Sequence, residues 1–150
     1  MFKYFDRYRV RRDLTQQDMM LKLQIRNGGI FKDYSSVMMV AGMVGYVNGK
    51  SRPIHTFGET VQLSFFSERD RMLIDLIAYA SSGGSQTIVN EEQKYKIFEE
   101  YVAAGFPILC RLLEVDENTE FDDHTYQRVL KKYYSLTLQK NGFKERGLQH

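Results

Sequence analysis

The residues best suited to chemistry in this chain are cations at alternating positions near its start. From Phe2 to Val10 the side chains alternate with the period of a β-strand. One face carries Phe2, Tyr4, Asp6, Tyr8 and Val10, and the other carries Lys3, Phe5, Arg7, Arg9 and Arg11, with Arg12 directly after. Such cations bind phosphate oxygens, as in a β-ribbon laid along DNA. The segment therefore predicts nucleic-acid contacts by Lys3, Arg7, Arg9, Arg11 and Arg12, with double-stranded DNA as the partner.

The histidines and the cysteine predict neither a metal site nor a nucleophile. His55, His124 and His150 lie far apart, with no cysteine or second histidine at ligand spacing. Cys110 lies in the apolar stretch PILCRLL with no base beside it, which favours an inert buried thiol. We expect no catalytic residue, no metal and no cofactor, and hence no enzyme.

Two further patterns have simpler structural explanations than a binding site. The glycine-rich stretch 82–85 lacks the lysine and the preceding strand of a phosphate-binding loop. The acidic residues of 91–100 and 116–123 lack calcium-loop spacing, so solvated helix faces are the expected interpretation.

The net charge of +2 hides a strong partition along the chain. Lys and Arg outnumber Asp and Glu by ten to four in residues 1–55 and by six to one in 125–150, whereas residues 56–124 hold five against fourteen. This asymmetry indicates a surface for nucleic acid or an acidic partner, joined to a part that repels phosphate. Alternatively, the oppositely charged parts neutralise one another within the fold.

Two helices are expected after the basic segment. The first spans roughly 14–26 and ends at Asn27, Gly28 and Gly29. The second begins at Asp33, Ser35 or Ser36, ends at Asn48 and Gly49, and is apolar nearly all round, so it must be buried on several sides. Small residues at Ala41, Gly42 and Gly45 let another element approach closely. Such burial in a short chain predicts a homodimer.

The remainder is predicted to be mainly helical. Thr60 to Phe66 alternates as a half-buried strand, and Ser67 with Asp70 resembles a capping box for a helix over 69–80. A helix over 91–104 follows, which Gly105 and Pro107 kink into a short helix ending at Leu113. The fold class is therefore α+β, predominantly helical, with a ribbon-helix-helix-like N-terminal part. We expect a single domain over 1–150, comprising a strand-helix-helix portion (1–50), a strand plus helices (60–113), a C-terminal helix (121–138) and a disordered tail (141–150).

Composition favours a reducing compartment. One cysteine permits no disulfide within the chain, and the basic start is not followed by the apolar stretch of a signal peptide. The longest apolar run, Val37 to Val47, is too short to span a bilayer. We expect a cytoplasmic protein with no membrane partner.

Several runs of the sequence resemble one family. These are GIFKDYSSVMMVAGMVGYVNGKSRPI, MLIDLIAYA and EEQKYKIFEEYVAAGFPILCRLL, and the resemblance covers about residues 7–113. They are similar to the small proteins associated with bacterial DNA phosphorothioation (Dnd) systems, of the fourth Dnd-associated type. The resemblance implies an accessory of a modification and restriction island, with other proteins of that defence system as partners, and it supplies no catalytic residues. The C-terminal helix and tail lie outside the resembling runs.

Two functions remain open from the sequence. In the first, a non-enzymatic accessory of phosphorothioation-linked defence associates with DNA through its basic N-terminal strand. In the second, a protein–protein adaptor docks a larger defence subunit through its acidic middle and does not contact DNA.

Overall fold

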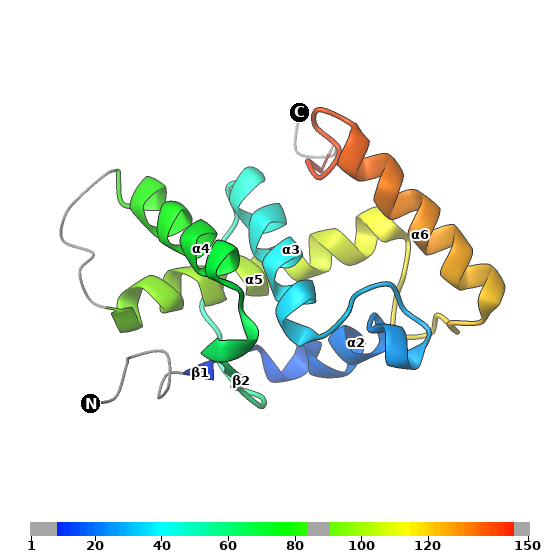
Figure 1. Cartoon of the computed structure of the whole chain (residues 1–150), viewed down its shortest axis with the longest axis horizontal. Coiled ribbons are helices and arrows are strands. Elements are labelled where there is room, and N and C mark those ends of the chain that lie inside the picture. Colours follow the sequence, from blue (N-terminus) through cyan, green and yellow to red (C-terminus); the bar gives the residue numbers. More distant parts are fainter. Residues whose placement is uncertain (1–8, 84–90, 146–150) are drawn as a thin grey trace.

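A computed structural model describes residues 9–83 and 91–145, in which one long helix organises the others (Figure 1). The elements are β1 (Arg9–Val10), α2 (Gln17–Lys22), α3 (Tyr34–Val47), β2 (Val61–Gln62), α4 (Glu68–Ser81), α5 (Glu91–Leu113) and α6 (Asp123–Leu138), with 3-10 turns at Leu14–Gln16, Ile25–Asn27 and Leu63–Phe65. α5 runs along most of the molecule, and α3 and α4 pack across it. The predicted class, α+β and predominantly helical, is confirmed.

The close packing of α3 on α5 depends on small residues from both helices. A Cβ added to Gly105 of α5 would lie 1.9 Å from the carbonyl oxygen of Ala41, and one added to Gly45 would lie 2.3 Å from that of Tyr101. Val37, Met38 and Val44 of α3 are fully buried. α3 is thus covered largely by its own chain, so its burial does not require a second copy, and the homodimer stays a prediction.

Asp33, one of three candidates in the sequence, is the cap of α3, and the expected capping box at the start of α4 is confirmed. The Asp33 carboxylate accepts from the Ser36 amide at the start of α3, and Ser67 and Asp70 form a complete capping box at the start of α4. Asp122 caps α6 in the same way. Side-chain oxygens at these positions satisfy amides that the first helical turn leaves without carbonyl partners.

Three expected elements differ from the structure. The helix expected over 14–26 is divided, because the Ile25 amide donates to Phe31 and the Phe31 amide to Leu23, which folds the chain back after α2. The strand expected over 60–66 is extended only at Val61–Gln62. The 3-10 turn that follows changes the phase of the side chains, so that Phe65 is 61% exposed and Phe66 is fully buried. The helix expected to kink at Pro107 is one element over Glu91–Leu113.

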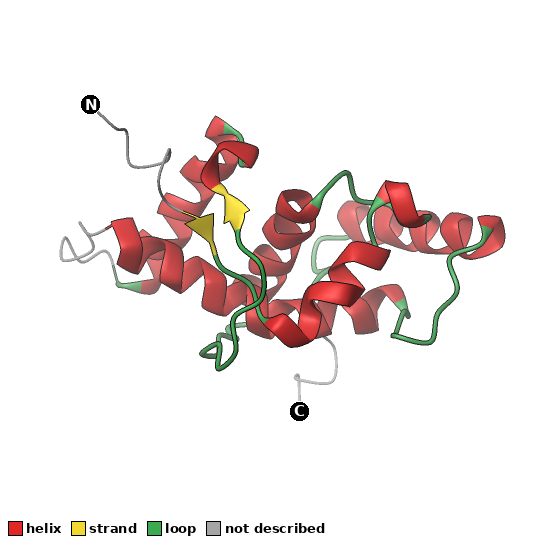
Figure 2. Cartoon of the chain, turned by 90° about the horizontal axis from the view of Figure 1, so that it is seen from below, coloured by secondary structure: helices red, strands yellow, loops and turns green. Residues whose placement is uncertain are grey.

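The described part of the N-terminal strand pairs within the chain. Arg9 lies opposite Gln62 and Val10 opposite Val61 in a two-stranded antiparallel sheet, visible in Figure 2. Residues 1–8, which include most of the predicted strand, lie outside the described residues. A ribbon formed between two copies therefore stays a prediction.

The start of the predicted tail contacts the end of α3. The Asn48 side chain donates to the carbonyl of Phe143 at 2.9 Å and accepts from the amide of Glu145 at 2.7 Å. Arg111 of α5 forms an ion pair with Glu145 at 2.7 Å. Residues 141–145 thus have defined contacts, and 146–150 lie outside the described residues.

Among the helices within 9–83 and 91–145, none combines the length and apolarity needed to cross a bilayer.

Candidate nucleic-acid interface

The predicted contact residues have three different environments. Lys3 and Arg7 lie outside the described residues. Arg9 is exposed beside the fully buried Val10, in agreement with the alternation along the strand. Arg11 and Arg12 follow β1, where the chain enters the core, and both have partners within the fold.

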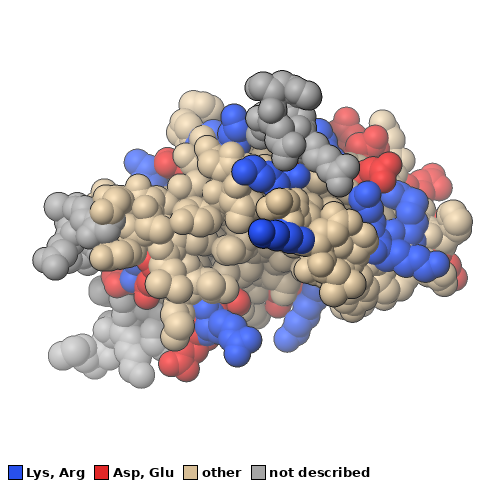
Figure 3. Space-filling model, turned by 90° about the horizontal axis from the view of Figure 1, so that it is seen from above, with Lys and Arg blue, Asp and Glu red and all other residues tan. Residues whose placement is uncertain are grey.

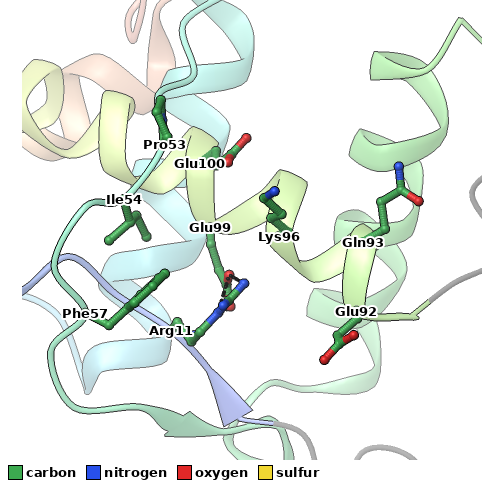
Figure 4. A pocket seen from close by; sticks show the side chains of 9 residues that line it. All are labelled: Arg11, Pro53, Ile54, Phe57, Glu92, Gln93, Lys96, Glu99 and Glu100. Atoms are coloured by element: carbon green, nitrogen blue, oxygen red, sulfur yellow. Dashed lines mark hydrogen bonds and ion pairs between the residues drawn. The ribbon is translucent and has the colours of Figure 1, made fainter.

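Arg11 is held by a buried carboxylate of α5. Its backbone amide donates to Glu99 Oε2 at 2.7 Å, its Nε donates to Oε1 at 3.0 Å, and its guanidinium lies 4.7 Å from the centre of the Phe57 ring. Glu99 is only 1% exposed, which corrects the expectation that the acidic residues of 91–100 are all solvated. The pair forms part of a cleft of about 630 Å³ (Figure 4). α5 contributes Glu92, Glu99 and Glu100 to this cleft. Because these carboxylates repel anions, the cleft is a poor phosphate site.

Arg12 is almost completely buried. It is 2% exposed, and its guanidinium carbon lies 3.7 Å above the centre of the Tyr34 ring. Nε donates to Gln17 at 3.3 Å and Nη2 to Glu59 at 3.4 Å, while Nη1 has no hydrogen-bond partner within residues 9–83 and 91–145. Burial lowers the pKa of Arg12, opposed by Tyr34 and Glu59. Arg12 is therefore a fixed cation whose hydrogen-bonding capacity is not fully used.

Four cations line one pocket beside the β1–β2 sheet. This pocket, termed here the basic pocket, has a volume of about 440 Å³ and is lined by the cations Arg9, Arg12, Arg26 and Lys32, with the start of α3 and residues 59–62. Arg9, Arg26 and Lys32 are exposed. Within the described parts of the chain, none of these three forms an ion pair.

Arg26 and Lys32 were not predicted as site residues. They come from the turn between α2 and α3, which folds back through the bridge between Gln24 and Phe31. Local sequence around Arg26 and Lys32 has no motif that marks them. The only available signal was the general excess of cations in residues 1–55.

The basic pocket is also lined by two carboxylates, which differ in how firmly hydrogen bonds hold them. Asp33 accepts from the Ser35 hydroxyl at 2.7 Å and from the Ser36 amide at 2.9 Å. Burial alone would raise the pKa of Asp33, but these hydrogen bonds outweigh it and lower the pKa. The Glu59 side chain is instead 81% exposed and contacts Arg12 only loosely. Asp33 is thus committed to capping α3, whereas Glu59 is easily displaced.

A second basic area lies on the face opposite the sheet. Figure 3 shows Lys and Arg side chains gathered over the part of the molecule where α6 lies. Lys131 and Lys132 of α6 are exposed, but Arg128 donates to the carbonyls of Leu113 and Glu114. This area is less suited to phosphate because part of its charge is used to hold the end of α5.

The acidic middle of the sequence does not form a single surface. Glu91 and Glu92 are in the first turn of α5, whereas residues 114–123 follow its other end. A 23-residue helix is about 35 Å long, so these two acidic groups are far apart.

The structure is that of a small, mainly helical protein with a short intrachain β-ribbon and a pocket lined by four cations. The chain belongs to the family described as DNA sulphur modification system-associated protein 4, which matches residues 9–142. This confirms the family suggested by the sequence and extends it, because α6, expected to lie outside the shared region, is included in the match. No curated protein and no solved structure matches the chain.

Proposed function

We propose that this protein is a non-enzymatic accessory of a DNA phosphorothioation-linked modification and restriction system, and that it contacts double-stranded DNA through the basic pocket. The observation that carries the proposal is the convergence of Arg9, Arg26 and Lys32, three exposed cations from separate segments without a carboxylate partner in the described residues. The family description supports association with such a system.

The cations contribute in different ways under this proposal. Arg9, Arg26 and Lys32 contact backbone phosphates, which position a protein on DNA without reading sequence. Arg11 positions the end of β1 through its bonds to Glu99. Lys3 and Arg7, which precede Arg9 in the sequence, are proposed to add further phosphate contacts.

The test compares two triple variants that remove the same charge. Arg9→Gln/Arg26→Gln/Lys32→Gln removes the exposed cations of the basic pocket, and Arg69→Gln/Lys131→Gln/Lys140→Gln removes three exposed cations elsewhere. Fluorescence anisotropy with a labelled duplex, with and without phosphorothioate, is measured across a salt series. The pocket variant should bind more weakly, and the slope of log K against log salt should fall by about 0.9 for each phosphate that the protein no longer neutralises.

Two results would contradict the proposal. An equal decrease in affinity in both triple variants would mean that net charge, not the basic pocket, determines binding. Absence of binding by the wild type at low salt would exclude a DNA contact and favour the adaptor.

A specific surface favours the adaptor as the second candidate function. Met72, Leu76 and Tyr79 lie along one face of α4 and are 58%, 57% and 58% exposed. An apolar stripe of this kind on a helix is typical of a protein-binding surface. Because the acidic groups lie at opposite ends of α5, the α4 stripe is the better single docking surface. Met72→Ser/Leu76→Ser should abolish co-purification with a co-encoded subunit if the adaptor function holds, and leave duplex binding unchanged.

A further inference from the structure

Arg12, which lines the basic pocket, has one unusual atom: among the described residues, its buried Nη1 has no hydrogen-bond partner. A buried guanidinium nitrogen normally has a hydrogen-bond partner, because desolvation without one is costly. Arg12 is 2% exposed, yet Nη1 has none, and the contact from Nη2 to Glu59 is long at 3.4 Å. The chain thus buries a guanidinium whose hydrogen-bond donors are not all paired within the described residues.

The orientation of this guanidinium is fixed from two directions. The ring of Tyr34 supports its face at 3.7 Å, and Gln17 accepts from Nε at 3.3 Å. Gln17 is itself fixed, since it also accepts from the Glu59 amide at 2.6 Å. The two terminal nitrogens of a planar guanidinium have the spacing that matches two oxygens of one anion, and the orientation of this guanidinium is fixed in advance.

We propose that the basic pocket is a binding site for a single phosphate group, with Arg12 as its central ligand and with the Glu59 carboxylate as an internal substitute that the phosphate displaces. The inference rests on the proposed function, since both use the same pocket, and it adds the chemical group that is bound and the residue that binds it.

The charges of the pocket fit a phosphate better than a cation or a neutral ligand. Four cationic side chains face two carboxylates, and Asp33 is committed to the α3 cap. Displacing Glu59 requires little rearrangement, because its side chain is 81% exposed and makes one long hydrogen bond. Arg9, Arg26 and Lys32, which line the same pocket, then add positive charge around an anion that Arg12 binds.

The first experiment titrates the wild-type protein with inorganic phosphate in a chloride buffer by calorimetry. Arg12→Gln should weaken binding at least about tenfold, because hydrogen bonds to charged groups are the strong ones. Lys32→Gln should weaken it severalfold, and Glu59→Gln should tighten it, because the internal competitor loses its charge. Arg69→Gln, an exposed change on α4, is the matched control and should leave the affinity unchanged.

The opposite effects of Lys32→Gln and Glu59→Gln keep the test decisive even if Arg12→Gln fails to fold, since both side chains are exposed. If the wild type shows no saturable heat with phosphate, or if Glu59→Gln and Lys32→Gln bind it as the wild type does, the phosphate site is wrong.

The second experiment identifies the source of the phosphate and separates this inference from the proposed function. Inorganic phosphate, a nucleoside monophosphate and an unlabelled duplex each compete with the labelled duplex. Phosphate should displace the duplex more effectively from the Glu59→Gln variant than from the wild type. That result would show that the pocket holds a backbone phosphate of DNA. Phosphate binding in the calorimeter without any duplex binding would support the phosphate site and overturn the proposed DNA contact. Duplex binding unaffected by phosphate and by Arg12→Gln would overturn the phosphate site alone.

Discussion

The side-chain amide of Gln16 donates to the carbonyl oxygen of Ala103 at 2.8 Å, across the interface between the N-terminal segment and α5. Ala103 lies four residues before Pro107, and proline has no N–H to donate to that carbonyl. Gln16, only 5% exposed, supplies a donor in its place. This relationship explains how α5 continues through Pro107 as one element, where the sequence predicts a second, short helix.

Gln16→Leu should therefore lower the free energy of unfolding by about 1–3 kcal/mol, since it leaves a buried carbonyl without a donor. In a Pro107→Ala background the restored N–H serves Ala103, so the same Gln16→Leu change should cost less. Urea unfolding of the wild type, both single variants and the double variant measures this coupling. Equal costs in both backgrounds would show that Gln16 acts only by packing.

Gly105→Ala should be among the most destabilising small substitutions in the chain. The added methyl would meet the Ala41 carbonyl oxygen at 1.9 Å and the Gly45 amide nitrogen at 2.5 Å, and backbone atoms cannot move aside without separating α3 from α5. We expect the free energy of unfolding to fall by about 3 kcal/mol or more, at the upper end of overpacking costs. Gly45→Val should behave similarly.

Gly49→Ala is the control for the glycine series. Gly49 has a φ of +63° and nothing within 4 Å of an added Cβ. The Gly49→Ala variant should lose only about 1–2 kcal/mol of its free energy of unfolding, because an alanine is strained in the left-handed backbone conformation. Thermal melts compare the series, and a Gly105→Ala protein as stable as Gly49→Ala would contradict the close packing of α3 on α5.

Arg11→Ala should destabilise the fold, whereas Arg9→Ala should not. The Arg11 side chain forms an ion pair with the Glu99 carboxylate, which is 1% exposed. Breaking a buried pair costs several kcal/mol, and here we expect about 2 kcal/mol or more because Arg11 itself is partly exposed. Adding Glu99→Gln to Arg11→Ala should recover part of the stability. Chemical denaturation measures the free energy of unfolding of all three proteins. DNA-binding assays on Arg11 variants must be compared at equal fractions of folded protein.

Stability should decline at alkaline pH. Burial raises the pKa of Cys110 to about 12, opposed by Arg111, and burial likewise raises that of Tyr95 to about 12. The folded state therefore holds these protons more tightly than the unfolded state, so this stabilisation is complete below pH 9 and is lost as the pH rises toward 12. Cys110→Ala should reduce the alkaline slope in denaturation curves. Iodoacetamide at about pH 8 should alkylate native Cys110 far more slowly than the unfolded thiol.

Features that depend on neighbouring residues in the sequence could be predicted, and those that depend on distant pairing could not. The sequence predicts the pair Ser67 and Asp70, and Asp33 as one of three candidates, because a cap acts within one turn of its helix. Gly45 was identified because an apolar helix containing small residues must be approached closely.

The basic pocket required information that no local pattern contains. Arg26 and Lys32 reach Arg9 only because β1 pairs with β2 and because the chain after α2 turns back to Phe31. The roles of Arg11 and Arg12 depend on Glu99 and Tyr34, which lie on other elements. Strand alternation places an arginine on a face, but it does not tell whether a carboxylate or an aromatic ring lies there.

The dependence of Arg11, Gln16 and Ala41 on α5 has a consequence for biosynthesis. Their partners on α5 lie far downstream, and Arg11 and Glu99 are separated by 88 residues. A ribosome releases the N-terminal half first, so nascent α3 emerges with its apolar surface uncovered until residues 91–113 leave the exit tunnel. Exposed apolar surface at this stage promotes aggregation and attracts chaperones. The newly made chain should thus need protection mainly during synthesis of its second half.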